Sequence, residues 1–299
     1  MQFGVALPQF GPKARGAEVG ERIRAMASAA DRLGYDVVWT AEHLVFPRRI
    51  ETPYPYGGSF PYDVNDPVLD VGATLAFVAA ATKRVRLGSA VVVLPYHHPV
   101  ALAKAIATVD VLSGGRVLLG VASGWLREEF ELLGVPFRER GARTDEAIDL
   151  LRALWTEETV HFEGRFHGLR DAAFSPKPAQ RPLPIWIGGD SPKALRRVGR
   201  RGDGWLAAPR DLATLERAID EVRREAESAG RDPTRIGVAS GGGARSVAEL
   251  VDLLPRLERI GVTIVNVPAL FWSETVEEAI DLLEDFAVRG GLRATAASP

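Results

Sequence analysis

The chain has 299 residues, 46% of them hydrophobic, and carries a formal net charge of -2 with no cysteine. This length suits one domain over residues 1–299, while the near-neutral charge and the shortness of the longest apolar run, residues 71–82, exclude strong attraction to nucleic acid and a membrane-spanning helix. The absence of cysteine excludes disulfides and thiol redox chemistry, so we expect a cytoplasmic protein that acts on a small-molecule substrate and needs a cofactor for any redox step.

Short β-branched runs recur along the chain and predict eight strands, over residues 3–7, 37–40, 85–94, 117–121, 185–187, 204–207, 236–239 and 262–267. Apolar residues at helical spacing between them predict helices over 19–33, 71–81, 100–112, 144–155, 212–229, 247–260 and 276–288. Alternating strands and helices, with nearly continuous apolar strands, predict an α/β fold with a parallel sheet. Eight such units without a linker favour a closed (β/α)8 TIM barrel over an open sheet.

Two insertions interrupt the repeat, one after strand 2 and one before strand 5. The first, residues 44–67, is rich in proline, glycine and aromatic residues, and a loop of this length in a compact domain is typically functional. We expect its aromatic side chains to close over a substrate: Tyr54, Tyr56, Phe60 and Tyr62. The second, residues 157–184, contains the stretch VHFEGRFHGL, whose alternation predicts a small hairpin.

The second strand ends in the stretch VVWTAEH, so Glu42 and His43 lie at its carboxyl end, where barrels place their active sites. A histidine there can exchange a proton near neutral pH. The alternatives are a histidine that satisfies a loop carbonyl, or a metal site formed with His97 and His98 of the stretch LPYHHP. Adjacent histidines on extended backbone point in opposite directions, and no recognised metal-binding spacing is present, so we predict no metal.

The fourth and fifth strands also end in residues suited to a ligand. After strand 4, Ser123 and Gly124 permit close backbone approach, and Trp125 offers a flat apolar surface. After strand 5, the stretch GGDSPK leads into a predicted helix start. Its amides, hydroxyl and cation form a candidate phosphate cradle made of Gly188, Gly189, Asp190, Ser191 and Lys193.

These segments together resemble the luciferase-like monooxygenase superfamily, over nearly the whole chain. The stretches LGYDVVWTAEH, VRLGSAVVVLPYHHPVALAK and PIWIGGDSPKALRRVGRRGDGWL carry the resemblance, and GWLREEFELLGVPFRERGARTDE is similar to its branch of F420-dependent oxidoreductases. The resemblance implies that His43 lies beside the reactive face of the deazaflavin or flavin ring and that Glu42 orients it or the loop. It also implies a bulged third strand behind the ring, at Ser89, Ala90 and Val91, with a cis Ala90–Val91 peptide, and a cofactor phosphate in the strand-5 cradle.

One departure from the F420 branch concerns the substrate. Its sugar-phosphate dehydrogenases carry a carboxylic acid just after strand 4, where this chain has Ser123. We therefore expect an F420-dependent oxidoreductase that acts on an apolar or aromatic organic substrate. An FMN-dependent two-component monooxygenase and a barrel that binds flavin without catalysis remain alternatives.

Two further expectations concern the cofactor and the subunits. F420 carries an acidic tail beyond its phosphate, and four arginines after strand 4, Arg127, Arg138, Arg140 and Arg143, either bind that tail or balance four glutamates of the same region, Glu128, Glu129, Glu131 and Glu139, on a solvated surface. The resemblance also implies a homodimer.

Overall fold

The computed structural model describes residues 1–208 and 211–292. In chain order its strands are β1 (Gln2–Ala6), β2 (Val37–Thr40), β3 (Arg86–Ser89), β4 (Val92–Val93), β5 (Val117–Ala122), β6 (Thr159–Glu163), β7 (Gly168–Ala173), β8 (Ile185–Gly188), β9 (Gly204–Leu206), β10 (Gly237–Ser240) and β11 (Ile264–Val267). Its α-helices are α1 (Val19–Leu33), α2 (Val71–Ala81), α3 (Pro99–Leu112), α4 (Arg127–Leu132), α5 (Arg140–Thr156), α6 (Pro192–Arg201), α7 (Leu212–Ser228), α8 (Val247–Ile260), α9 (Ala269–Trp272) and α10 (Val276–Arg289). Single 3-10 turns form η1 (Pro12–Ala14), η2 (Leu94–Tyr96), η3 (Phe137–Glu139) and η4 (Pro233–Arg235).

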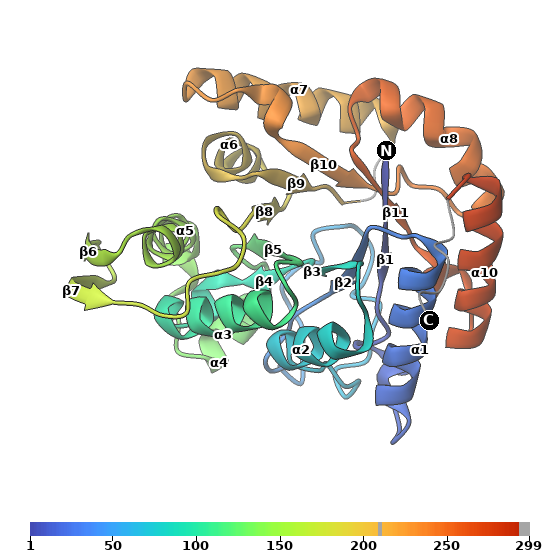
Figure 1. The fold of residues 1–299 in the computed structure, drawn as a ribbon, viewed down its shortest axis with the longest axis horizontal. Helices are drawn as coiled ribbons and strands as arrows, with labels where there is room; N and C mark the ends of the chain where they lie inside the picture. The colour runs from blue at the N-terminus through green and yellow to red at the C-terminus, as the bar shows by residue number, and fades with distance from the viewer. Residues whose placement is uncertain (209–210, 293–299) are drawn as a thin grey trace.

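Within the described residues, the strands form a closed parallel barrel. Their order is β3-β2-β1-β11-β10-β9-β8-β5-β4, and an additional pairing between β3 and β5 joins the two ends of the sheet. Figure 1 shows the helices arranged around these strands. The predicted (β/α)8 barrel is confirmed, because β3 and β4 together occupy one of its eight positions.

The third barrel strand differs from the continuous strand predicted over residues 85–94. It is split into β3 and β4, and the Ala90–Val91 peptide between them is cis, as the family resemblance implies. Both halves pair with β5, in registers that leave Ala90 and Val91 outside the ladder. The strand therefore bulges at the mouth of the barrel.

Three helices differ most from the sequence-based expectation. The helix expected over residues 144–155 begins at Arg140, because η3 runs directly into its first turn. Helices α4 and α9 were not predicted, since six and four residues are too few to show a helical repeat of apolar residues.

Tryptophans fill the interior of the barrel. Trp39 of β2 and Trp186 of β8 lie there, and a Cβ atom added at Gly88 would come within 2.3 Å of the Trp39 ring, while one at Gly204 would come within 2.2 Å of the Trp186 ring. Glycine at these two positions therefore makes room for the indoles. Since the interior is packed with side chains, a ligand site must lie at the mouth.

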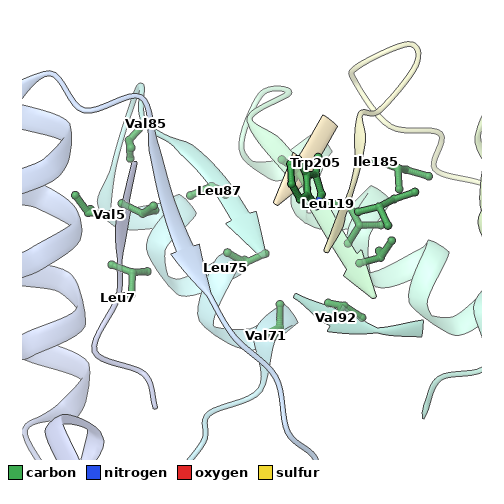
Figure 2. Close-up of a cluster of buried hydrophobic side chains, with 14 of the residues drawn as sticks. Val5, Leu7, Val71, Leu75, Val85, Leu87, Val92, Leu119, Ile185 and Trp205 are labelled. Atoms are coloured by element: carbon green, nitrogen blue, oxygen red, sulfur yellow. The ribbon is translucent and has the colours of Figure 1, made fainter. Parts of the chain in front are cut away.

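A second apolar layer lies between the strands and the surrounding helices. Val5 of β1 and Leu87 of β3 are fully buried in the same cluster as Leu75 of α2 (Figure 2). Trp205, Leu119 and Ile185 belong to this cluster on the other side of the close-up. This layer fixes the strands, and so fixes the residues at their carboxyl ends.

The two predicted insertions are present. Residues 44–67 contain no helix or strand among the described residues, and the hydrogen bonds Gly11 N to Pro67 O (3.1 Å) and Leu69 N to Gln9 O (3.0 Å) tie the end of this loop to the segment after β1. The second insertion contains the predicted antiparallel hairpin, β6 with β7, which Figure 1 shows beyond α5 at one edge of the molecule. No helix in the described part of the chain has the length and apolarity to cross a bilayer.

Candidate functional site

His43 lies at the mouth of the barrel, just after β2, and is held by a glutamate from the helix that follows another strand. Its Nδ1 atom lies 2.7 Å from Oε2 of Glu129, which belongs to α4, the helix that follows β5. The Glu129 side chain is fully buried, and that of His43 is 10% exposed. The two groups form a buried hydrogen-bonded pair that was not among the predictions from the sequence.

Glu129 accepts hydrogen bonds through both of its carboxylate oxygens. Oε1 accepts from the backbone amides of Leu44 (2.7 Å) and Val45 (3.2 Å), and Oε2 accepts from the Tyr96 hydroxyl (3.0 Å) as well as from His43. A carboxylate only accepts, so the proton of the His43–Glu129 hydrogen bond belongs to Nδ1 of the ring. The Nε2 atom of His43 is then the one that can exchange a proton with a ligand.

Glu42 was expected to orient His43 or the loop, and its contacts exclude the first of these two roles. Its Oε1 atom lies 2.9 Å from His97 Nε2, and its Oε2 accepts from the Val93 amide at 2.7 Å. Glu42 therefore does not orient His43; it holds the backbone that follows the Ala90–Val91 bulge. The correction has a geometric cause, because neighbouring residues on extended backbone point in opposite directions.

The histidines considered as metal ligands are divided between separate contacts. His43 pairs with Glu129, His97 pairs with Glu42, and the His98 ring lies 5.6 Å from that of His167. In the described parts of the chain, no three metal-ligating side chains gather.

The aromatic residues of the first insertion form one cluster that contacts His43 through Phe46 and Phe60. The Phe60 ring lies 5.7 Å from the His43 ring and 5.8 Å from that of Trp125, and Tyr54 lies 5.3 Å from Trp125. The Tyr62 ring packs against the Phe60 ring, with 5.7 Å between their centres. Tyr56 contacts Tyr54 from outside and is 53% exposed. The predicted loop therefore forms an aromatic cover over the histidine.

Burial affects the phenol groups around this cover. It raises the pKa of Tyr62 to about 12, with smaller contributions from Tyr54 and Asp66, and it raises the pKa of Tyr54 as well. The pKa of Tyr96 is raised by burial first and then by the charge of Glu129. These hydroxyls therefore stay protonated at neutral pH and can donate hydrogen bonds.

The bulge between β3 and β4 lies next to the turn after β8, which is the fifth strand of the barrel and is called the strand-5 turn below. A Cβ atom at Gly188 would lie 2.9 Å from Val91 Cγ1, so the two predicted cofactor segments are neighbours. Ala90 is exposed and Val91 is half-buried. Ser89 is completely buried, and its hydroxyl bonds both the carbonyl and the amide of Gly120. We therefore assign the Ser89 side chain to closure of the barrel instead of ligand contact.

The turn after β5 also has a backbone that requires glycine. Gly124 has φ of 76°, and a Cβ atom there would lie 2.7 Å from both Phe130 and Val93. Ser123 and Trp125 on either side are half-buried, and the indole of Trp125 lies 6.2 Å from the His43 ring. Trp125 therefore lies where it can contact a ring bound beside His43.

The strand-5 turn joins β8 to α6 as predicted. Gly189 has φ of 107°, and the Ser191 side chain caps α6 by accepting from Ala194 N. The Gly189 carbonyl accepts from Trp205 Nε1 at 2.9 Å, which fixes the turn. Lys193 is exposed and Asp190 is half-buried. The hydroxyl, the ammonium and the amides suit a phosphate, whereas the Asp190 carboxylate supplies no donor.

Sequence reasoning missed four residues beside His43. Phe46 and Phe10 lie 4.5 and 5.8 Å from its ring, and Glu129 and Tyr96 form the hydrogen-bond network described above. A fifth residue, Gln9, is 1% exposed and donates through Nε2 to Ala41 O, while its Oε1 is a buried acceptor without a partner among the described residues. The sequence analysis named Glu129 only as one of the glutamates that balance the arginines after strand 4, and it gave the other four positions no role.

A closed barrel whose mouth holds a carboxylate-paired histidine has the architecture of an enzyme. The chain belongs to the luciferase-like monooxygenase family, whose profile matches residues 1–249. An uncharacterized protein of Mycobacterium tuberculosis is 36% identical to it over 245 residues, which cover 81% of this chain and 83% of that one.

Two named proteins are also similar. The F420-dependent glucose-6-phosphate dehydrogenase of Amycolatopsis mediterranei is 35% identical over 228 residues, covering 74% of this chain and 64% of that one. The crystal structure of monooxygenase RslO1 from Streptomyces bottropensis superposes with a TM-score of 0.79 at 25% identity, covering 97% of this chain and 98% of that one. The resemblance seen in the sequence is confirmed, and the protein is an oxidoreductase.

Proposed function

We propose that this protein is an F420-dependent oxidoreductase in which His43 gives or takes a proton. The observation that carries this proposal is the buried His43–Glu129 pair at 2.7 Å, which directs Nε2 of the ring away from Glu129 at the barrel mouth. The similarity to an F420-dependent dehydrogenase supports the choice of cofactor. When bound, a deazaflavin exchanges a hydride with the substrate at its C5 atom.

The residues present fit such a cofactor. The bulge at Ala90–Val91 and the Gly124–Trp125 turn would hold its ring, and the turn from Gly188 to Lys193 would hold its phosphate. The φ values of Gly124 and Gly189 belong to conformations that side-chain-bearing residues rarely adopt, so glycine sets the path of the backbone at both turns. Glu42 contributes indirectly, because its bond to Val93 N fixes the end of the bulge.

The aromatic cover defines the proposed substrate site. Tyr54, Tyr56, Phe60 and Tyr62 would contact the substrate and exclude water from it, which strengthens polar interactions with Nε2 of His43. An apolar or aromatic organic molecule suits such a lining. Ser123, where sugar-phosphate dehydrogenases of the F420 branch carry an acid, disfavours a sugar phosphate.

An FMN-dependent monooxygenase is the second candidate, and the structural likeness to monooxygenase RslO1 favours it. Fluorescence titration of the purified protein with F420 and with FMN separates the two. Tighter binding of F420, with turnover of the reduced cofactor, supports our proposal. Tight FMN binding without F420 binding would replace it with the monooxygenase, and flavin binding without turnover of any test substrate would indicate a carrier.

The strand-5 turn provides a test of the phosphate cradle. We expect Gly189→Ala to raise the cofactor Kd roughly tenfold, the effect of losing about 1.5 kcal/mol from one charge-assisted hydrogen bond. Gly230→Ala is the matched control, because Gly230 also has a positive φ, of 70°, with nothing within 4 Å of an added Cβ. Equal effects of the two substitutions on Kd would place the phosphate elsewhere.

We also propose a homodimer, formed through the outer faces of α2 and α3. The exposed residues of α2 are Ala73, Phe77 and Ala80, and α3 exposes Ala101, Lys104, Ala105, Val111 and Leu112, so this surface is apolar except for Lys104. Phe77 is 44% and Leu112 is 72% exposed in the single chain. A helix that is apolar on all sides is normally covered.

Light scattering tests the dimer. We expect twice the 32.4 kDa mass of the chain, and a shift toward the single-chain mass in Leu112→Glu, because the substitution places a carboxylate in an apolar interface. Leu132→Glu on α4, where Leu132 is 58% exposed, is the control and should leave the mass unchanged. A single-chain mass for the unmodified protein across a wide concentration range would exclude the dimer.

A further inference from the structure

Two arginines share the ring of Phe137, the first residue of η3. Arg127 begins α4 and Arg140 begins α5, and their guanidinium carbons lie 5.2 and 3.9 Å from the centre of that ring. Arg140 also donates from Nη1 to the Phe137 carbonyl at 3.0 Å. An aromatic face attracts a guanidinium, so one ring holds both cations in place.

Three of the four carboxylates that were expected to neutralise these arginines are used elsewhere. Glu128 accepts from Thr52 N (2.8 Å) and Thr52 Oγ1 (2.8 Å), in the aromatic loop, and Glu129 holds His43. Glu139 pairs with Arg143 at 2.8 Å and with Arg165 at 2.9 Å. Among residues 1–208 and 211–292, neither Arg127 nor Arg140 forms an ion pair with a carboxylate.

The surroundings of Arg140 are positive. Burial lowers its pKa first, and the charges of Arg127 and Arg197 lower it further. Arg197 is compensated by Asp145, at 2.6 Å, but among the described residues no such partner stands by Arg140. A partly desolvated cation beside like charges is stabilised by an added anion.

Contacts link this pair of cations to both turns of the proposed cofactor site. Helix α4 begins directly after the Gly124–Trp125 turn, and its Phe130 packs on the Phe137 ring at 5.2 Å. On the other side, Arg197 of α6 donates to the carbonyl of Gly141, the residue after Arg140. Helix α6 is the helix that starts at the strand-5 turn.

We propose that Arg127 and Arg140 form a carboxylate-binding site for the oligoglutamate tail of F420, where the tail leaves the barrel mouth. The inference rests on the proposed function. Guanidinium groups bind carboxylates with paired hydrogen bonds, and the stacking on Phe137 orients both before the tail arrives. FMN ends at its phosphate and has no group for this site, so the site selects between the two cofactors.

The test compares deazaflavins that differ only beyond the ring. The purified protein is titrated by fluorescence with the ribityl deazaflavin that lacks phosphate and tail, with F420 lacking glutamates, with F420 carrying several glutamates, and with FMN. We expect affinity to rise with glutamate number in the unmodified protein and to weaken with added salt. In Arg127→Ala/Arg140→Ala we expect F420 with several glutamates to bind no more tightly than F420 without them. The Kd of the glutamate-carrying form should rise roughly three- to tenfold for each guanidinium–carboxylate pair that the substitutions remove.

Arg138→Ala is the matched control, since Arg138 is an exposed arginine of the same η3 turn, and it should behave as the unmodified protein. Arg127→Lys/Arg140→Lys keeps the charge and should retain part of the gain. An equal gain from the tail in the double alanine variant, or no gain in the unmodified protein, would overturn the carboxylate site while leaving the F420 function standing. Binding of FMN alone, with none of the deazaflavins bound, would reject both.

Discussion

Replacing His43 by alanine is expected to lower kcat by roughly 10²- to 10⁴-fold, the usual contribution of proton transfer by a positioned side chain. The cofactor Kd should change little, because the proposed ring and phosphate contacts come from the strand-3 bulge and the two glycine turns. Steady-state kinetics with the cofactor identified by titration, together with the Kd of the variant, measure the two effects separately.

The control for this substitution is His98→Ala. His98 is an exposed histidine at the start of α3, and its ring contact is with His167, away from the aromatic cover. It should turn over at the rate of the unmodified protein. If His43→Ala also keeps that rate, His43 has no role in proton transfer, and Nε2 serves at most to contact the substrate.

The barrel was predictable because its strands are short, nearly continuous apolar runs. Most of them are followed by a segment whose apolar residues repeat at helical spacing. The register of such a sheet places strand ends together, so His43, Ser123 and Gly188 were expected at one mouth from the sequence alone. The bulge at Ala90–Val91 was expected only through the family resemblance. No local property of the stretch SAVVV marks one of its peptide bonds.

Glu129 shows what sequence reasoning overlooked. In the stretch REEFELL it lies among three other charged residues, which is typical of a solvated helix face. Its spacing carried a signal, because Leu126, Glu129, Phe130 and Leu133 follow one face of a helix, and Leu126 and Phe130 are fully buried. A carboxylate on an apolar face needs a partner, so this pattern favoured a pairing with the histidine at a neighbouring strand end.

The aromatic cover was predictable only in part. The loop over residues 44–67 was marked by its length and by its tyrosines, but Phe10 and Phe46 were not marked by anything. The contact between Phe10 and His43 joins two segments far apart in the chain, and loops without a regular period do not indicate such pairings. The same applies to Glu128, whose bonds to Thr52 fasten the loop to α4.

The His43–Glu129 pair predicts a second large effect. In Glu129→Gln, the amide nitrogen that replaces one oxygen is a donor, so the side chain can no longer accept from Leu44 N, Val45 N, Tyr96 Oη and His43 Nδ1 together. Either a loop amide loses its acceptor, or the ring takes the other tautomer and Nε2 becomes protonated. We expect kcat to fall by roughly 10²-fold, at the lower end of what positioned proton transfer contributes.

Stability and binding measurements distinguish this positioning role from a purely structural one. Glu129→Leu removes the acceptor of the His43 ring, of the Tyr96 hydroxyl and of two partly exposed loop amides, and should lower the free energy of unfolding by about 1–3 kcal/mol, the cost of one buried donor left without a partner. Glu129→Gln keeps most of these bonds and should unfold closer to the original, with an unchanged cofactor Kd. Glu131→Gln, on the exposed side of the same helix, is the control for both. The rate of Glu129→Gln is then measured with saturating cofactor at low temperature. If these conditions restore kcat, Glu129 supports only the fold and cofactor binding. If kcat stays low, Glu129 orients His43 for proton transfer.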